Sequence, residues 1–241
     1  MNEIINSLYN RKSVRVYEDK PIPSELKEII LESAIQAPTA GCQQLYTIID
    51  VTDQNLKDKL AVSCDNQPFI AKAPMVLVFC ADCKKWYDAY IEAGANPRKP
   101  GTGDLMLAVS DTVIAAQNAV VAAESLGIGS CYIGDIMENC EIQRNLLNLP
   151  EYVFPAAMIV FGWPTEQQKQ RKKPERCDLN YIVHENGYNE MNREQLKGML
   201  SKNYKNQTFE EWCSAFCNRK YNSDFAREMT RSVDEYLKQF D

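Results

Sequence analysis

The sequence of 241 residues contains a single histidine, His184. One histidine cannot build a His-rich metal centre or a two-histidine relay, and a Ser-His-Asp hydrolase would need this residue at its centre. Gly-x-Ser-x-Gly and Walker motifs are also absent, and Tyr132 stands where a third glycine would follow Gly127 and Gly129 in a dinucleotide-binding motif. The sequence therefore predicts chemistry on a bound cofactor that is not held by a Rossmann motif.

An excess of positive charge is missing as well. The 27 Lys and Arg residues face 33 Asp and Glu residues, so the net charge is -6. Such a chain repels polyphosphates as a whole, so we expect no nucleic-acid partner and no membrane surface, and any phosphate site must be local. Polar residues interrupt the long apolar stretch at 109–129, and the N-terminus lacks the order of a signal peptide. We therefore expect no membrane-spanning helix and a cytoplasmic location.

The nine cysteines lack the paired spacings of a disulfide framework or a zinc site. Cys80 and Cys83 have the two-residue gap of a redox or metal motif. They follow an apolar run rather than opening a helix, however, and Asp82 between them disfavours a thiolate. Buried packing is therefore favoured for both cysteines, with a redox role as the alternative.

Hydrophobic spacing and turn signals predict alternating helices and strands. We expect helices near 2–10, 24–38, 53–62, 104–126 and 141–149, and strands near 45–51, 73–81, 130–133 and 156–162. This order favours a parallel doubly wound sheet, although periodicity alone does not separate it from a mixed sheet with helices on both sides. The apolar surface of the helix at 104–126 exceeds one stripe, so it must cross the domain or meet another subunit.

Two groups of cations stand out in this acidic chain. The N-terminal basic segment, residues 11–15, reads Arg-Lys-Ser-Val-Arg, and in an extended conformation Arg11, Ser13 and Arg15 point to one side. Two guanidinium groups and a hydroxyl could then converge on a phosphate, although a solvated basic turn is the simpler alternative. The second basic cluster, Lys173 and Arg176, can serve the same anion only if the fold brings it there.

A series of short motifs runs in order through most of the chain. They are the N-terminal basic segment with Tyr17 and Pro21-Ile22; Ala-Pro-Thr-Ala-Gly at 37–41; Gln67; Asp111-Thr112 and Ala-Gln-Asn-Ala at 116–119; Ala-Glu-Ser-Leu-Gly-Ile-Gly at 123–129; Tyr-Ile-Gly at 132–134; Phe-Gly-Trp-Pro at 161–164; Lys-Pro-Glu-Arg at 173–176; and Val-His-Glu-Asn at 183–186 with Tyr188. In this order the chain resembles the FMN-dependent nitroreductases, in particular the branch of oxygen-insensitive NADPH nitroreductases and flavin reductases.

The resemblance implies an α+β fold, a three-layer α-β-α sandwich with a helical C-terminal extension. We expect an FMN-binding core at residues 1–183 and the extension at residues 184–241. It further implies a homodimer with FMN in a groove between the subunits. The implied contacts are Arg11, Lys12, Ser13 and Arg15 to the phosphate and part of the ring, Arg176 and Lys173 to the phosphate, Thr39 and Gln67 across the interface, and Tyr132, Ile133 and Gly134 along the ring.

Two departures from the family pattern bear on these contacts. Many relatives have an Asn and a Gln-Pro-Trp after the Ala-Pro turn, where this chain has Cys42, Gln44, Leu45 and Tyr46. An extra residue also separates Lys173 from Arg176, so the lysine that contacts the phosphate is not fixed by the motif.

The function implied is an oxidoreductase that takes hydride from NAD(P)H and passes it to a nitroaromatic, quinone or flavin acceptor, with no side-chain acid or base. Several alternatives remain open: a different flavin reduction, such as enone reduction or dehalogenation; a flavin-binding redox sensor or storage protein that uses Cys80 and Cys83; and an anion-binding domain without flavin.

Overall fold

The structure, a computed structural model, describes residues 1–241 and divides into two compact units. The core unit consists of Met1–Arg171 and Glu228–Asp241, and the second unit of Lys172–Arg227. The last helix, α11 (Asp224–Leu237), begins in the second unit and ends in the core unit. The sequence instead predicts a boundary between residues 183 and 184, where an FMN-binding core would end and a helical extension would begin. This boundary differs from that of the two compact units and stays a proposal.

One antiparallel sheet forms the middle of the core unit. Its strands are β1 (Tyr46–Asp50), β2 (Met75–Asp82), β3 (Gly129–Ile133) and β4 (Val153–Gly162), in the order β1-β2-β4-β3. All three pairs are antiparallel, so the parallel sheet favoured by the alternating pattern is wrong. The pattern misled because helices here connect antiparallel strands, and because β2 and β4 are buried on both faces, as parallel strands usually are.

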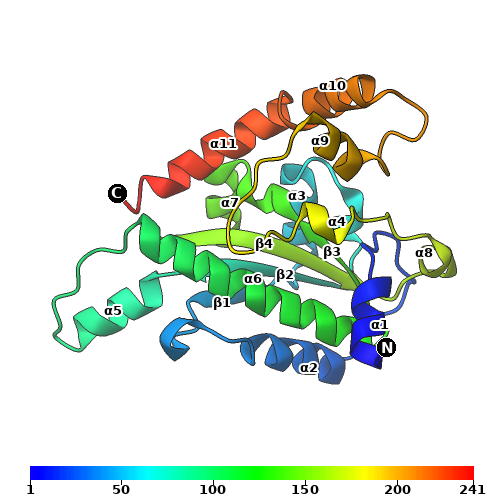
Figure 1. The fold of residues 1–241 in the computed structure, drawn as a ribbon. Helices are drawn as coiled ribbons and strands as arrows, with labels where there is room; N and C mark the ends of the chain where they lie inside the picture. Colours follow the sequence, from blue (N-terminus) through cyan, green and yellow to red (C-terminus); the bar gives the residue numbers. More distant parts are fainter. The chain divides into compact units, whose positions relative to one another are not determined.

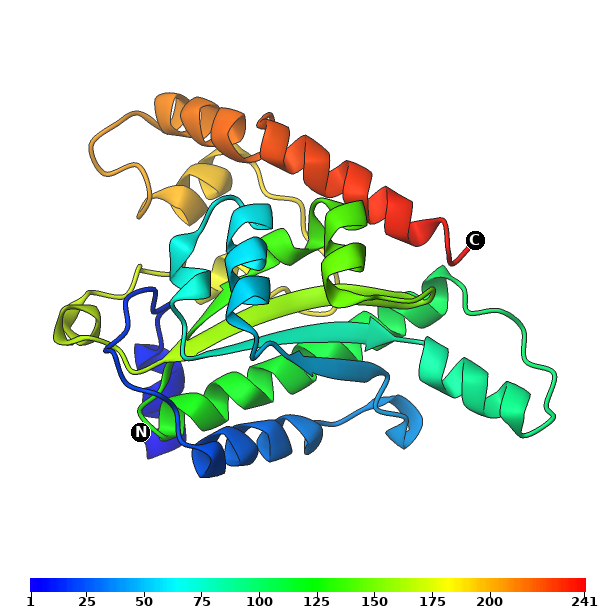
Figure 2. The same cartoon turned by 180° about the vertical axis from the view of Figure 1, so that it is seen from behind.

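Helices cover both faces of this sheet, which confirms the three-layer α+β sandwich (Figures 1 and 2). On one face lie α2 (Ser24–Ile35) and α6 (Thr102–Ser125), and on the other lie α3 (Gln54–Ser63) and α7 (Cys140–Leu147). Alternate residues of β2 divide between the two cores: Met75, Leu77 and Phe79 pack with α2 and α6, whereas Val76, Val78 and Cys80 pack with the opposite layer.

Local signals account for most of the helix boundaries. Asn2 caps α1 (Glu3–Asn10) by accepting a hydrogen bond from Ile5 N at 2.9 Å, and Asp53 caps α3 by accepting one from Leu56 N at 2.8 Å. The shorter core helices α4 (Pro68–Ala71), α5 (Lys84–Glu92) and α8 (Glu166–Gln170) were not expected from the sequence. No residue of α5 is buried, although Trp86 packs against the core from it. The second unit contains α9 (Arg193–Leu200) and α10 (Phe209–Lys220).

The long helix α6 has two apolar sides. Its buried residues, among them Ala108, Ala115, Ala119 and Ala123, line the core. By length and composition, α6 is long and apolar enough to cross a membrane. The polar residues in this stretch therefore do not exclude a spanning helix, contrary to the expectation from the sequence. The packing of its buried side on the sheet is that of a core helix. Its other side leaves Met106 64% exposed and Ile114 40% exposed.

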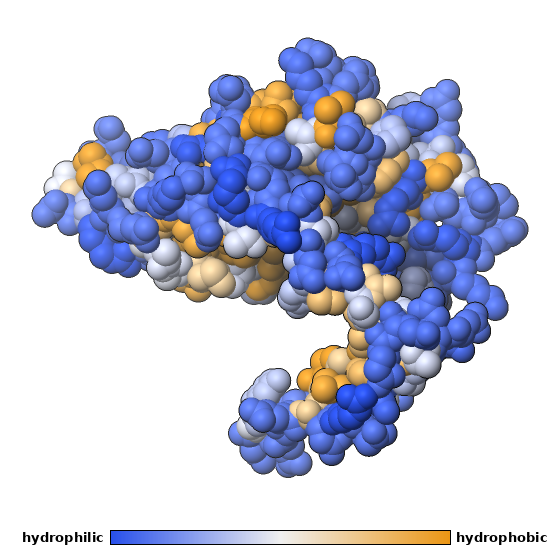
Figure 3. All heavy atoms as spheres, turned by 90° about the horizontal axis from the view of Figure 1, so that it is seen from above, coloured by the Kyte–Doolittle hydropathy of each residue, from blue (hydrophilic) through white to orange (hydrophobic).

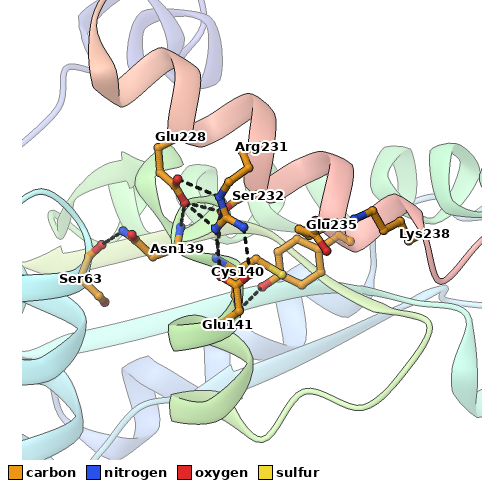
Figure 4. Close-up of polar contacts among 10 residues, drawn as sticks. Ser63, Asn139, Cys140, Glu141, Glu228, Arg231, Ser232, Glu235 and Lys238 are labelled. Atoms are coloured by element: carbon orange, nitrogen blue, oxygen red, sulfur yellow. Dashed lines mark hydrogen bonds and ion pairs between the residues drawn. The ribbon is translucent and has the colours of Figure 1, made fainter.

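A polar network fixes the core part of α11 to α7 (Figure 4). Arg231 donates to both oxygens of Glu141, at 2.8 and 2.9 Å, and pairs with Glu228. Because Arg231 hydrogen-bonds both carboxylates, the pKa values of Glu141 and Glu228 are lowered to about 2. Ser232 Oγ accepts from Cys140 N at 2.9 Å, which satisfies a donor at the start of α7.

The surface in Figure 3 is mainly hydrophilic, with separate hydrophobic patches.

Candidate functional site

The N-terminal basic segment lies along the edge strand β3. Ser13 forms a parallel bridge with Ser130, and Val14 N donates to Ser130 O at 2.9 Å. The approach is close because residue 129 is glycine: a Cβ on Gly129 would lie 2.5 Å from Val14 Cγ2. The extended conformation expected at Ser13 is therefore present, and main-chain contacts hold it against the sheet.

Arg11 carries the clearest sign of an anion site. Its guanidinium carbon lies 5.8 Å from the centroid of the Tyr132 ring, and its Nε and Nη2 atoms are buried without a hydrogen-bond partner within the chain. Buried polar groups in folded proteins almost always have a partner. A phosphate oxygen would satisfy both atoms with charge-assisted hydrogen bonds, so the residues present fit the phosphate of FMN.

Lys12 connects the N-terminal basic segment to residues 169–171, where the first stretch of the core unit ends. Its Nζ donates to the carbonyls of Lys169 and Arg171, both at 2.5 Å, and Arg171 in turn donates from Nη2 to Ser13 O. Two of the three ammonium donors of Lys12 are thus used within the protein. Its role on the phosphate stays a prediction that would use the third donor, while the part played by Arg171 was not expected from the sequence.

Arg15 and the turn that contains Gln67 meet through an aromatic ring. The Arg15 guanidinium carbon lies 5.8 Å from the centroid of the Phe69 ring, and Arg15 N donates to Gln168 Oε1 at 3.4 Å. Gln67 donates from Nε2 to Cys64 O at 2.9 Å and precedes Phe69 by two residues. The structure thus brings two of the predicted contact regions together. Arg15 also lines a groove of about 920 Å³ with Phe69.

Residues 132–134 lie at the end of β3, where Tyr132 is next to Arg11. Tyr132 OH donates to Gln117 Oε1 on α6 at 3.3 Å, and burial raises the pKa of Tyr132 to about 12 although Arg11 lowers it. The phenol therefore stays protonated at neutral pH and acts as a donor. Ile133 is buried, whereas a Cβ on Gly134 would meet no atom within 4 Å. The main chain at Gly134 is therefore open to solvent, and its contact with the flavin ring stays a prediction.

Thr39 lies in a different place, in the loop that leads to the other edge strand. Its hydroxyl donates to Asp111 Oδ2 on α6 and accepts from Gln44 N at 2.8 Å. Gln117, which meets Tyr132, is six residues further along α6, or about 9 Å along the helix axis. Within one chain, Thr39 is therefore not in contact with the N-terminal basic segment. In the sequence, Asp111 is a residue of a family motif and an interruption of an apolar stretch, but nothing there marks it as the anchor of this loop.

The second basic cluster belongs to the second unit, which is described by itself. Lys202 Nζ donates to Arg176 O at 2.9 Å and to Asp178 Oδ1 at 2.6 Å, so it fixes the main chain around Arg176. The Arg176 residue is exposed and Lys173 is half-buried. The contact of Lys173 and Arg176 with the phosphate stays a prediction.

The cysteines favour the packing interpretation. Cys80 and Cys83 are both buried, and burial raises the pKa of each thiol to about 12, with Asp82 raising both further. Neither thiol forms a thiolate at neutral pH, which a redox sensor would need. His184 accepts a hydrogen bond from Asn189 N at 3.0 Å and lies against the ring of Tyr188.

Comparisons with known proteins agree on one family. A model described as "Nitroreductase family" matches residues 8–163. The chain is 32% identical over 238 residues to the "FMN reductase [NAD(P)H]" of Bacillus subtilis, covering 98% of this chain and 91% of the relative. It is 33% identical to the "Oxygen-insensitive NADPH nitroreductase" of Salmonella typhimurium, covering 81% and 79%. The solved structure of B. megaterium NfrA2 matches with a TM-score of 0.86 and 28% identity, covering 98% of both chains.

Proposed function

This chain belongs to the nitroreductase family, and we propose that it is an FMN-dependent oxidoreductase that reduces small acceptors at the expense of NAD(P)H. Bound FMN would supply the hydride chemistry, accepting hydride from NAD(P)H and passing it on in a second half-reaction. The acceptor classes are nitroaromatics, quinones and free flavins. We propose the cytoplasm as the place of action.

The observation that carries this proposal is the half-buried guanidinium of Arg11, whose Nε and Nη2 atoms are buried. It has two unsatisfied donors and lies beside the ring of Tyr132, on a segment that main-chain contacts hold against β3. A buried cation without a partner costs free energy, which a bound phosphate would offset. Arg11 would thus hold the phosphate end of FMN, with Ser13 and the third donor of Lys12 beside it.

The remaining predicted contacts divide by chemistry. Phe69 holds Arg15 next to the Gln67 turn of the same chain. We therefore propose that Gln67 meets the polar edge of the ring beside Arg15, and not from across the interface as the resemblance implied. Tyr132, Ile133 and Gly134 would line the ring, where the open space at Gly134 lets it approach the main chain. As the resemblance implies, Lys173 and Arg176 would also contact the phosphate.

We further propose that two chains form a homodimer through α6 and α1. The exposed side of α6 carries Met106, Val113 and Ile114. Helix α1 contains no buried residue, and its apolar Ile4 is 64% exposed. Large contiguous apolar surfaces on soluble chains usually mark an interface. A second chain would also supply Thr39, which lies apart from the other predicted contacts within one chain.

An absorbance spectrum of the purified protein with added FMN, followed by an anaerobic titration with NAD(P)H, tests the proposed function. We expect a bound flavin that NAD(P)H bleaches and a nitroaromatic or quinone reoxidises over many cycles. A protein that stays colourless with FMN present would contradict the proposal and favour an anion-binding domain. A flavin that NAD(P)H bleaches but acceptors reoxidise for only one cycle would favour a sensor or storage protein.

A further inference from the structure

Asp111 is a carboxylate buried inside an apolar helix. It is 4% exposed and lies on α6 between buried residues such as Ala108 and Ala115. Its oxygens accept hydrogen bonds from Ala40 N at 3.0 Å, from Leu45 N at 3.3 Å and from the hydroxyl of Thr39. A buried carboxylate is tolerated only when donors surround it, and here the donors all come from one loop.

This loop, residues 39–45, depends on outside support. Cys42 and Gln44 have φ angles of 56° and 50°, in the left-handed region that residues with side chains adopt at a cost. Asp111 joins the two ends of the loop, because Ala40 lies at its start and Leu45 at its end. Trp86 Nε1 adds a hydrogen bond to Gln43 O, in the middle of the loop, at 2.6 Å.

The same contacts decide what Thr39 can offer a ligand. A hydroxyl has one hydrogen to donate, and Thr39 gives it to Asp111. Its oxygen already accepts from Gln44 N at 2.8 Å, which leaves one lone pair. Toward a ligand, Thr39 can therefore accept from an O–H or N–H group but cannot donate.

We propose that Asp111 is a positioning residue for the flavin site: it fixes loop 39–45 and orients the Thr39 hydroxyl so that it accepts a hydrogen bond from the FMN bound by the second chain. This inference rests on the proposed function. Asp111 itself does not contact the cofactor; it acts through Thr39. It also explains why a carboxylate, rather than an apolar residue, occupies this position in the middle of α6.

The first test is hydrogen exchange of the protein without FMN, in wild type and in Asp111→Asn. The amide side chain keeps the shape of aspartate but loses its charge and turns one acceptor into a donor. We expect the amides of Ala40 and Leu45 to exchange about 10-fold faster or more, while α6 keeps its protection. Ser125→Ala, exposed at the other end of α6, is the control and should leave the loop unchanged. Unchanged exchange in Asp111→Asn would overturn the proposal.

The second test separates positioning from mere stability. Asp111→Asn and Thr39→Val should both shift the visible absorption of bound FMN and weaken its binding, and the double variant should be no worse than the poorer single variant. Thr39→Ser keeps the hydroxyl and should restore the wild-type spectrum. A normal flavin spectrum and affinity in Thr39→Val would overturn the proposal, even if Asp111→Asn failed to fold. A wild-type chain that binds no FMN would instead remove the proposed function, and the exchange experiment would still decide whether Asp111 holds the loop.

Discussion

The two basic clusters are similar in sequence but different in structure. The N-terminal basic segment is held against β3 by main-chain contacts, and its Arg11 has two buried guanidinium nitrogen atoms without a partner. The second basic cluster lies in the second unit, with Arg176 exposed and its main chain held by Lys202. A cation fixed in a buried position gains more from an anion than one that already has water.

This difference shows that the spacing of cations in the sequence does not by itself indicate how much a cluster contributes to phosphate binding. In the sequence, the first cluster offers three cations and the second offers two, each at a spacing suited to one phosphate. Only the first is preorganised by the fold of its own unit, so we expect it to supply most of the affinity for the phosphate. The second cluster should add a smaller, salt-sensitive contribution.

Replacing Arg11 should have the largest effect on binding. A charge-assisted hydrogen bond contributes about 1.5–3 kcal/mol, so Arg11→Ala should weaken FMN binding about 10- to 150-fold. Fluorescence titration of FMN measures the affinity, and the melting temperature of the FMN-free protein serves as the control for folding. Arg11→Lys keeps the charge and should lose less. Equal affinities of wild type and Arg11→Ala for FMN would contradict the claim that the N-terminal basic segment supplies most of the affinity for the phosphate.

Gly129→Ala should loosen the support of the N-terminal basic segment. The new Cβ would lie 2.9 Å from Val14 Cβ, so the segment must shift away from β3. Overpacking of this kind costs about 1–3 kcal/mol of unfolding free energy, and FMN affinity should fall with it. Gly103→Ala is the matched control, because its Cβ meets no atom within 4 Å and alanine favours helix. A stable Gly129→Ala variant with normal affinity would show that the close approach does not matter.

A third position should control the dependence of stability on pH, separately from either cluster. Burial raises the pKa of Glu138 to about 7, with Asp135, Asp65 and Glu228 adding to the shift, and its Oε1 has no partner. The folded state then holds a proton that the unfolded state releases near pH 4.5, so this site makes stability fall as pH rises from about 4.5 to 7. Glu138→Gln should raise the unfolding free energy at pH 8 by about 1–3 kcal/mol and leave it nearly unchanged at pH 4. Denaturant unfolding at both pH values checks this, and equal effects at both would contradict it.

Replacing Arg176 should have the smallest effect. An exposed ion pair contributes about 0.2–1 kcal/mol, so Arg176→Ala should weaken FMN binding about fivefold or less, and the loss should shrink further in high salt. Lys173→Ala provides the comparison within the same cluster. A loss as large as that of Arg11→Ala would show that the second cluster is as well organised as the first.

The sequence predicted the elements of the core better than their connections. Caps at Asn2 and Asp53 and the apolar spacing of α6 located helices correctly, because these signals are local. The direction of the strands depends on long-range pairing, which the burial of β2 on both faces concealed. The same limit applies to the site: the charge of Arg11 was visible in the sequence, but its burial against Tyr132 was not, and Asp111 revealed its role only through loop 39–45.

The most direct test of the account compares FMN with riboflavin, which lacks the phosphate, on wild type and Arg11→Ala. If Arg11 is the preorganised phosphate ligand, wild type should bind FMN much more tightly than riboflavin, and Arg11→Ala should lose most of that preference while its affinity for riboflavin changes little. Equal losses for both ligands, or an undiminished preference for FMN in the variant, would contradict the central claim.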